Sequence, residues 1–221
     1  MANEFRGIAF FDSDGTITLE NSNGVFARNR GMAELHASLE ESRYHDRITS
    51  GMYNGCIAPV YEGLTLAEVM ELCEKIPVID GVAETTAELA INGIMSVIVT
   101  CGVGDVARII KERFGFHRYF GAELEFDDHG IATGYRTSLI GIEHKPVIVD
   151  YVCGQSGIPV QYTFGIGDSM SDIPMFKRVG VSIAINYDPR VDGHARHYIK
   201  NSGSLYDVVP IILEVVGRWT R

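Results

Sequence analysis

The chain has 221 residues and a formal net charge of −10, from 29 acidic and 19 basic side chains. This length gives a well-buried core and favours one domain with an insertion. The acidic balance argues against non-specific nucleic-acid binding, which requires a basic surface.

Neither a membrane span nor a targeting segment is indicated by the sequence. No apolar stretch approaches the length that crosses a bilayer, and residues 1–6 run directly into an apolar segment without a signal-peptide pattern. We therefore expect a soluble cytoplasmic protein with no membrane partner. The four cysteines form no C-x-x-C pair, so neither a disulfide framework nor a zinc site is indicated.

The first predicted element is a buried strand over Gly7–Phe11, an apolar and aromatic-rich run that ends in Asp-Ser-Asp-Gly-Thr. Side chains two residues apart on extended backbone point the same way, so we expect Asp12 and Asp14 to face one reaction centre. Asp, Ser and Gly are also common turn formers, and this segment on its own remains open to interpretation as a turn.

Residues 18–79 contain helix-prone stretches, such as Gly31–Arg43 and Thr65–Lys75, with no convincing strand between them. This segment predicts a helical insertion that enters directly after the Asp-Gly-Thr turn. It would then lie above the carboxyl edge of a sheet, where open α/β folds bind ligands. A helical decoration without a role is the alternative.

After residue 80, helical and apolar β-prone runs alternate, which is typical of a parallel, doubly wound, Rossmann-like α/β sheet. We therefore assign residues 1–17 and 80–221 to an α/β core and residues 18–79 to a small helical cap. The predicted helices are Gly81–Asn92, Val103–Phe114, Pro146–Cys153, Ile173–Val179 and Leu205–Trp219. The predicted strands are Ile94–Thr100, Gln161–Ile166 and Val181–Ile185, and a hairpin is expected over Gly121–Arg136.

A second acidic cluster, Asp168 to Asp172, again follows a predicted strand. Ser171 is expected to cap the next helix, with Pro174 in its first turn. If this strand neighbours the first one, Asp12, Asp14 and Asp168 converge, and such carboxylates are costly to bring together without a cation. Oxygen ligands of this kind suit Mg²⁺. Alternatively, acids near a helix start merely complement its dipole, which explains Asp172 better than Asp168.

Two weaker features lie between these clusters. Thr100-Cys101-Gly102 ends a predicted strand and offers a hydroxyl and backbone N–H groups to a phosphate. Pro146 favours a helix start and biases Lys145 toward extended backbone, from which a lysine can reach inward to an anion. Either feature alone is commonplace, since strand-end threonines and surface lysines are frequent.

Taken in order, Asp-x-Asp-Gly-Thr, the strand-end Thr, the Lys and Gly-Asp-x-x-x-Asp resemble the four motifs of the haloacid dehalogenase (HAD) superfamily of phosphohydrolases. The resemblance covers nearly the whole chain. The spacing from Lys145 to Asp168, the helical insertion and the segment Gly121–Gly134 are most similar to the phosphoserine phosphatase subgroup.

This resemblance implies a Mg²⁺-dependent phosphomonoesterase for a small phosphorylated metabolite. It implies that Asp12 is the nucleophile that becomes an aspartyl phosphate, and that Asp14 is the general acid and base. The implied phosphate-binding residues are Thr100, Cys101, Gly102 and Lys145. The implied metal-site residues are Asp12, Asp14 (through its carbonyl), Asp168 and Asp172.

The cap departs from the subgroup's pattern for recognising an amino acid. The position of the subgroup's cap glutamate holds Asn21, with Glu20 one residue earlier, and the expected arginine is missing from Asn54–Tyr61. Glu20 and Asn21 are therefore candidate substrate contacts, but phosphoserine itself is a doubtful substrate. Other cap arginines are candidates for meeting an acidic substrate tail: Arg28, Arg30, Arg43 and Arg47.

Other functions remain open from the sequence. A phosphotransferase or phosphomutase would use the same aspartyl phosphate, and a non-catalytic aspartate phosphoacceptor is a further alternative. A dehalogenase is disfavoured because Asp14 and Asp168 serve a metal-assisted phosphoryl reaction. The oligomeric state is not indicated.

Overall fold

The computed structural model describes residues 5–45, 47–138 and 140–219. Met1–Glu4, which begin the segment expected to run into the first strand, lie outside them. The predicted parallel sheet is confirmed: six strands in the order β3-β2-β1-β6-β7-β8 all run parallel. The strands are β1 (Gly7–Phe11), β2 (Ile94–Val103), β3 (Arg118–Ala122), β6 (Thr163–Gly167), β7 (Val181–Ile185) and β8 (His197–Ile199).

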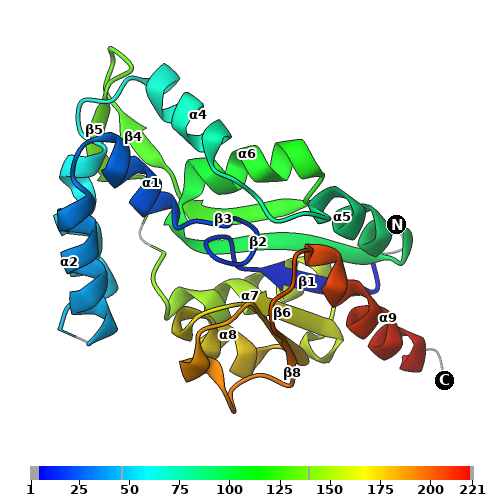
Figure 1. Ribbon diagram of the computed structural model, residues 1–221. Helices are drawn as coiled ribbons and strands as arrows, with labels where there is room; N and C mark the ends of the chain where they lie inside the picture. The colour runs from blue at the N-terminus through cyan, green and yellow to red at the C-terminus, as the bar shows by residue number, and fades with distance from the viewer. Residues whose placement is uncertain (1–4, 46, 139, 220–221) are drawn as a thin grey trace.

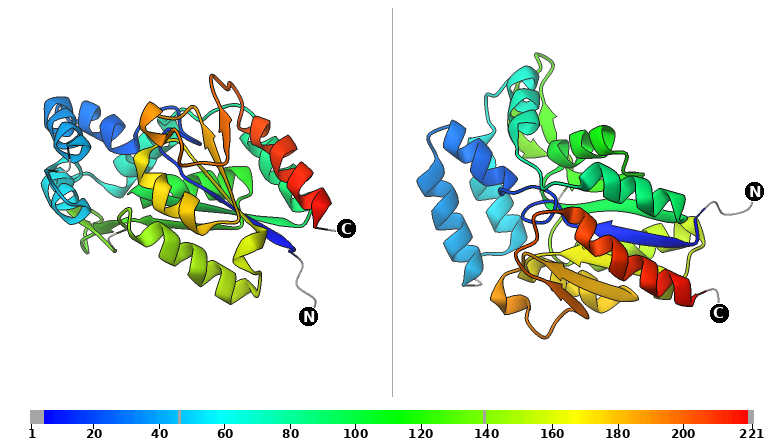
Figure 2. Two further views of the ribbon diagram at one scale, coloured as in Figure 1. Left: turned by 90° about the horizontal axis from the view of Figure 1, so that it is seen from below. Right: turned by 45° about the vertical axis from the view of Figure 1, so that its right-hand side comes forward.

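Helices cover both faces of this sheet (Figures 1 and 2). One face packs against α5 (Val82–Ile91), α6 (Gly104–Phe114) and α9 (Val209–Arg218). The other face packs against α7 (His144–Ser156) and α8 (Ile173–Arg178). The chain therefore forms the doubly wound arrangement expected from the alternation in its sequence.

Strand β1 lies in the middle of the sheet and is buried on both faces. Ala9 and Phe11 belong to the hydrophobic cluster under α5 and α6, whereas Ile8 and Phe10 belong to the cluster under α7 and α8. Each large apolar side chain so buried contributes about 1.5–3 kcal/mol relative to exposure. Burial on both faces explains why this strand appears in the sequence as a continuous apolar run.

The segment between β1 and α5 is helical, as predicted. Thr65 begins α4 with a capping box, because its side chain accepts from the Glu68 N–H while the Glu68 carboxylate accepts from the Thr65 N–H. The insert follows the carboxyl end of β1 and lies beyond that edge of the sheet (Figure 1). Its helices are α1 (Ser22–Asn29), α2 (Ala33–Tyr44), α3 (Ser50–Ile57) and α4 (Leu66–Lys75), with a 3₁₀ turn over Ala58–Val60.

The predicted hairpin is present as the antiparallel strands β4 (Leu124–Phe126) and β5 (Ala132–Arg136). It packs on the insert: the Ala132 N–H donates to Leu64 O at 2.7 Å, and the Gly63 N–H donates to Ala132 O at 2.9 Å. The hairpin thus meets the cap although it belongs by sequence to residues 80–221. The division into 1–17 with 80–221 and 18–79 stays a prediction.

Several local expectations were wrong. Lys145 is helical rather than extended, because α7 begins at His144 and Pro146 is its third residue, where a missing N–H is tolerated. Ser169, not Ser171, caps the turn before α8, since its side chain forms a capping box with Asp172. Strand β2 extends to Val103 and α6 begins at Gly104, so Thr100, Cys101 and Gly102 lie within the last part of the strand rather than after its end. The other differences concern short elements: strands β3 and β8 were not predicted, and Val160–Tyr162 and Leu205–Val208 are 3₁₀ turns.

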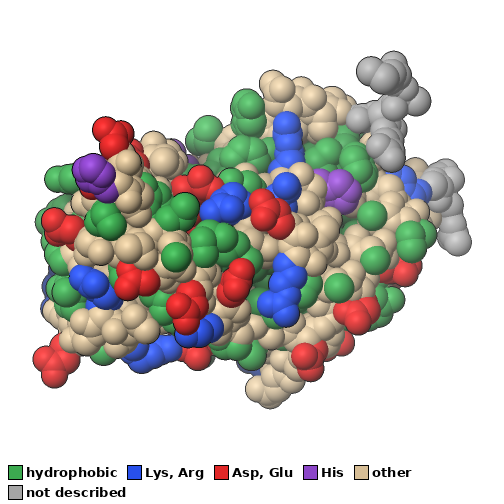
Figure 3. Space-filling model, turned by 90° about the horizontal axis from the view of Figure 1, so that it is seen from above, with side chains coloured by type: hydrophobic (Ala, Val, Ile, Leu, Met, Phe, Trp, Pro, Cys, Tyr) green, Lys and Arg blue, Asp and Glu red, His purple; other side chains and the backbone are tan. Residues whose placement is uncertain are grey.

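Within the part of the chain that the structure describes, no helix is both long enough and apolar enough to cross a bilayer. Figure 3 shows acidic and basic side chains interspersed on the face seen from above.

Candidate active site

Asp12 directly follows β1 and Asp168 directly follows β6, the strand paired with β1. The chain moves outward from β1 to β2 and β3 on one side and continues at β6 on the other, so these residues lie at a topological switch point. The Asp12 N–H donates to Ile166 O at 2.9 Å, which fixes the backbone at this junction. Open α/β sheets bind ligands at this position.

Asp168 is held by the turn that follows Asp14. The Thr16 hydroxyl donates to Asp168 Oδ1 at 3.0 Å. Gly15 has a φ of +87°, and a Cβ there would lie 2.4 Å from Asp168 Oδ2. Glycine therefore satisfies both the left-handed backbone and the close approach of the carboxylate.

Lys145 is fully buried and forms ion pairs with two carboxylates. Its Nζ lies 2.6 Å from Asp12 Oδ1 and 2.6 Å from Asp172 Oδ1. Burial alone would lower the pKa of Lys145, but attraction to these carboxylates outweighs it and raises the pKa well above its usual value. Lys145 thus reaches inward as predicted, and the alternative of a solvated surface lysine is excluded.

Both carboxylate oxygens of Asp172 accept hydrogen bonds. Oδ1 pairs with Lys145, while Oδ2 accepts the N–H groups of Asp168 and Ser169, each at 3.1 Å. These bonds tie the loop after β6 to Lys145 at the start of α7. Asp172 therefore does more than complement the dipole of α8.

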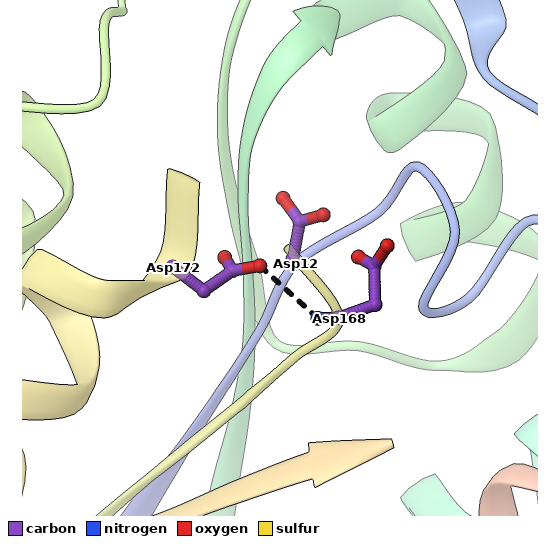
Figure 4. A group of neighbouring side chains, drawn as sticks. All are labelled: Asp12, Asp168 and Asp172. Atoms are coloured by element: carbon purple, nitrogen blue, oxygen red, sulfur yellow. Dashed lines mark hydrogen bonds between the residues drawn. The ribbon is translucent and has the colours of Figure 1, made fainter. Parts of the chain in front are cut away.

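Carboxylate oxygens of Asp12, Asp168 and Asp172 lie within 4.8 Å of one another. Figure 4 shows the carboxylates of Asp12 and Asp168 pointing in a similar direction, with that of Asp172 directed toward them. Burial, followed by the charges of Asp12 and Asp172, raises the pKa of Asp168 well above its usual value. The single positive charge of Lys145 neutralises only one of the three negative charges of these carboxylates. The available ligand atoms are all oxygen, so the residues present fit a hard divalent cation such as Mg²⁺.

Asp14 lies beside the last residues of β2. Its Oδ2 accepts from the Ser22 hydroxyl at 2.8 Å, and that hydroxyl oxygen accepts from the Val103 N–H at 3.1 Å. A Cβ at Gly102 would lie 2.4 Å from Asp14 Oδ2, so only glycine permits this approach. Burial raises the pKa of Asp14, which favours a carboxyl that can hold and release a proton.

Thr100, Cys101 and Gly102 line a pocket of about 200 Å³ together with Asp12, Asp14 and Asp168. The buried Thr100 hydroxyl oxygen accepts from the Gly102 N–H at 2.9 Å. Burial raises the pKa of Cys101 to about 11, so this thiol is neutral at neutral pH. The pocket therefore offers no thiolate nucleophile at this position.

The insert supplies the other wall of the same pocket through Asn21, Asn23 and Arg43. Asn21 also caps α1, its Oδ1 accepting from the Gly24 N–H at 3.1 Å. Glu20 does not line the pocket and instead pairs with Arg28 near the surface.

Of the four cap arginines considered from the sequence, Arg43 lines this pocket. It extends from α2, lies 2.8 Å from Glu40 Oε2 and has its guanidinium 5.1 Å from the centre of the Tyr53 ring. Both partners belong to the insert, so the insert itself orients this cation.

Arg136 was missed from the sequence. From β5, its Nη1 donates to Gly102 O at 3.2 Å, and its Nη2 donates to Asn23 Oδ1 at 2.9 Å and to Tyr61 Oη at 2.7 Å. It therefore joins the end of β2 to the insert. Its charge contributes to lowering the pKa of Asp14 against the larger effect of burial. A single basic residue at the end of a hairpin strand gave no signal of this contact.

The family model described as haloacid dehalogenase-like hydrolase matches residues 9–177, and the chain belongs to this family. The chain is 23% identical over 184 residues to the phosphoserine phosphatase of Methanocaldococcus jannaschii, covering 83% of this chain and 87% of that protein.

Two solved structures share the fold. A phosphoserine phosphatase with a phospho-aspartyl intermediate analogue superposes with a TM-score of 0.83 at 23% identity, covering 94% of this chain and 99% of that one. A substrate-bound phosphoserine phosphatase complex gives a TM-score of 0.83 at 22% identity, covering 93% and 98%.

These findings confirm the resemblance stated from the sequence, including its phosphoserine phosphatase-like character. They also confirm the enzyme class: the chain is a HAD-family phosphatase, a hydrolase. The cluster of three aspartates agrees with a metal site in an enzyme of this class.

Proposed function

We propose that the protein is a Mg²⁺-dependent phosphomonoesterase that acts on a small phosphorylated metabolite through an aspartyl phosphate on Asp12. The observation that carries this proposal is the meeting of Asp12, Asp168 and the Lys145–Asp172 pair at the carboxyl ends of β1 and β6. Asp14 lines the same pocket, so a second carboxyl is available for proton transfer.

In the proposed reaction, an Asp12 oxygen attacks phosphorus and the ester P–O bond breaks. Asp14 gives its proton to the leaving alkoxide, which departs as a neutral alcohol. Asp14 then takes a proton from a water molecule that attacks the aspartyl phosphate, releasing inorganic phosphate and restoring Asp12. The raised pKa of the buried Asp14 supports this role, because its protonated form persists to higher pH than that of a solvated aspartate.

We assign the phosphoryl oxygens to the Thr100 hydroxyl, the Cys101 and Gly102 N–H groups and Lys145; the Gly102 N–H, which donates to Thr100 Oγ1 in this structure, would share its hydrogen between that oxygen and the phosphate. Charge spread over these oxygens is the main feature of the transition state that such a site stabilises. Lys145 suits this role as a buried point charge already fixed by two carboxylates.

Asp12, the Asp14 carbonyl and Asp168 would hold Mg²⁺, and Asp172 would order the surrounding ligands directly or through water. When bound, the ion neutralises charge on the phosphoryl group and keeps Asp12 ionised. The contacts of Asp172 with Lys145, Asp168 and Ser169 support its part in ordering the site.

The substrate is proposed only as a class. The relatives named above are phosphoserine phosphatases, but Asn21 stands at the position of the cap glutamate, so phosphoserine remains doubtful for this chain. Arg43 extends into the pocket from a different part of the insert and is a candidate substrate contact. A contribution from Glu20 and the expected cytoplasmic location stay predictions.

The test is phosphate release from a panel of small phosphomonoesters, including phosphoserine, in Mg²⁺ and in EDTA. Asp12→Asn protein, shown to be folded by circular dichroism, is the blank. Metal-dependent release that this substitution abolishes supports the proposal. Substrate consumed without an equivalent of free phosphate would indicate transfer to a second hydroxyl, as in a phosphotransferase or phosphomutase.

A further inference from the structure

A second cavity, of about 470 Å³, lies between the insert and the core beside the catalytic pocket. We call it the α2 groove. Ala37, Glu41 and Tyr44 of α2 line one side, and Ile142, Met170 and Arg190 of the core line the other.

The α2 groove continues the catalytic pocket, because both are lined by Arg43, Ser169 and Ser171. Small-molecule sites usually measure about 300–1,000 Å³. The pocket around Asp12, at about 200 Å³, falls below that range. The groove, at about 470 Å³, has more than twice the volume of that pocket. A ligand that fills this site therefore extends beyond the phosphoryl pocket.

The charged groups of the groove are already paired with protein partners. Arg43 pairs with Glu40 at 2.8 Å, and Arg190 pairs with Asp188 at 2.7 Å. Glu41 lies 2.9 Å from His45 Nε2. This lining therefore gives no strong preference for a second highly charged group.

Apolar side chains are exposed on both sides of the groove. Tyr44 from α2 is 54% exposed and Met170 from the core is 42% exposed. The Arg190 guanidinium stacks on the Tyr44 ring, 3.8 Å from its centre, and so links insert and core at this point. Exposed apolar groups facing a common cavity favour contact with an apolar ligand.

We infer that the α2 groove binds the alcohol part of the substrate, and that this alcohol is larger than serine, uncharged, and apolar or aromatic in its body. This inference rests on the proposed phosphomonoesterase function and names the substrate class for it. The ester phosphate occupies the pocket at Asp12, while the rest of the molecule passes Arg43 and Ser171 to lie between Tyr44 and Met170.

The test compares 1-naphthyl phosphate with phosphoserine for wild-type protein, Ala37→Trp and Ser38→Trp. Ala37 lines the groove, whereas its exposed neighbour Ser38 on α2 does not, so Ser38→Trp is the matched control. We expect wild-type kcat/KM to favour 1-naphthyl phosphate by at least about 10-fold. Ala37→Trp should remove at least about 10-fold of kcat/KM for that ester alone, and Ser38→Trp should change it less than about 2-fold.

Equal activity on both esters, or an Ala37→Trp protein that keeps its preference, would overturn the inference while leaving the phosphomonoesterase intact. Binding of 1-naphthyl phosphate is measured separately by calorimetry with Asp12→Asn protein, with and without the additional Ala37→Trp substitution. Naphthyl phosphate that binds and loses affinity with Ala37→Trp, but is hydrolysed by no variant, would support the groove and contradict the proposed function. No binding of naphthyl phosphate would overturn the groove.

Discussion

The two walls of the pocket are built differently. On the core side, Lys145 and Asp172 are fully buried, and their bonds connect Asp12, Asp168 and Ser169 in one network. On the insert side, the Arg43 side chain is 33% exposed and is oriented by partners within the insert. In the proposed reaction the core therefore fixes the groups that react, whereas the insert presents a surface that can select the substrate.

The largest effect is expected at the centre of the core wall. Asp12→Asn should lower turnover by at least about 10⁴-fold on every ester, because the amide cannot form the aspartyl phosphate. Steady-state phosphate release on two unlike esters measures this. Activity that survives on one ester would show that the core residues do not carry the reaction for all substrates.

Lys145→Met tests whether the core wall is an interlocked network. The substitution leaves the Asp12 and Asp172 carboxylates buried without their cation, which should destabilise the fold by about 3–5 kcal/mol. Urea denaturation at neutral pH measures the change. The exposed Lys177→Met on α8 is the control and should stay within about 0.5 kcal/mol of wild type, and equal effects would contradict the network.

Asp14→Asn should lower turnover by at least about 10²-fold, as for loss of a general acid and base. Burial raises the pKa of Asp14, so its protonated form is present below that pKa and is lost as pH rises through it. Wild-type kcat should therefore fall along an alkaline limb, and the limb should be missing from the variant. An unchanged profile in Asp14→Asn would assign the proton transfer to another group.

Arg136→Met tests the connection between the two walls. It removes the bonds to Gly102 on the core side and to Asn23 and Tyr61 on the insert side. We expect kcat to fall about 10-fold on all esters, the equivalent of about 1.4 kcal/mol. Tyr61→Phe removes one of the bonds and should have a smaller effect. A change in substrate preference without a fall in kcat would show that Arg136 acts in substrate selection, together with the insert side of the pocket.

The smallest effect is expected at Glu20. Its carboxylate pairs with Arg28 near the surface and does not line the pocket, and such pairs contribute about 0–1 kcal/mol. Glu20→Gln should change kcat/KM by less than about 2-fold for any ester. A larger change for one ester would show that Glu20 contributes to substrate selection by the insert.

The sequence predicted the core wall well because strand ends determine it. Asp12 and Asp168 each follow an apolar run, and parallel strands bring such ends to one edge. Lys145 was predicted to reach inward but with the wrong backbone, because Pro146 fits the first turn of α7 and does not force the residue before it to be extended.

The insert wall could not be predicted in the same way. The sequence does not distinguish Arg43 from the three other arginines of the insert, and only tertiary packing brings Arg43 to the pocket. Arg136 reaches the site because the hairpin packs on the insert through Leu64 and Ala132, a contact without a local sequence signal. Helical periodicity identifies a buried face but not the ligand that an exposed side chain meets.

The aspartyl phosphate on Asp12 is tested most directly by a rapid acid quench of the wild-type protein with a ³²P-labelled ester and Mg²⁺, followed by peptide mapping. We expect a covalent, hydroxylamine-labile phosphate on the peptide that contains Asp12, and none on Asp12→Asn protein. Phosphate release without any covalent label, with Asp12→Asn still active, would contradict it.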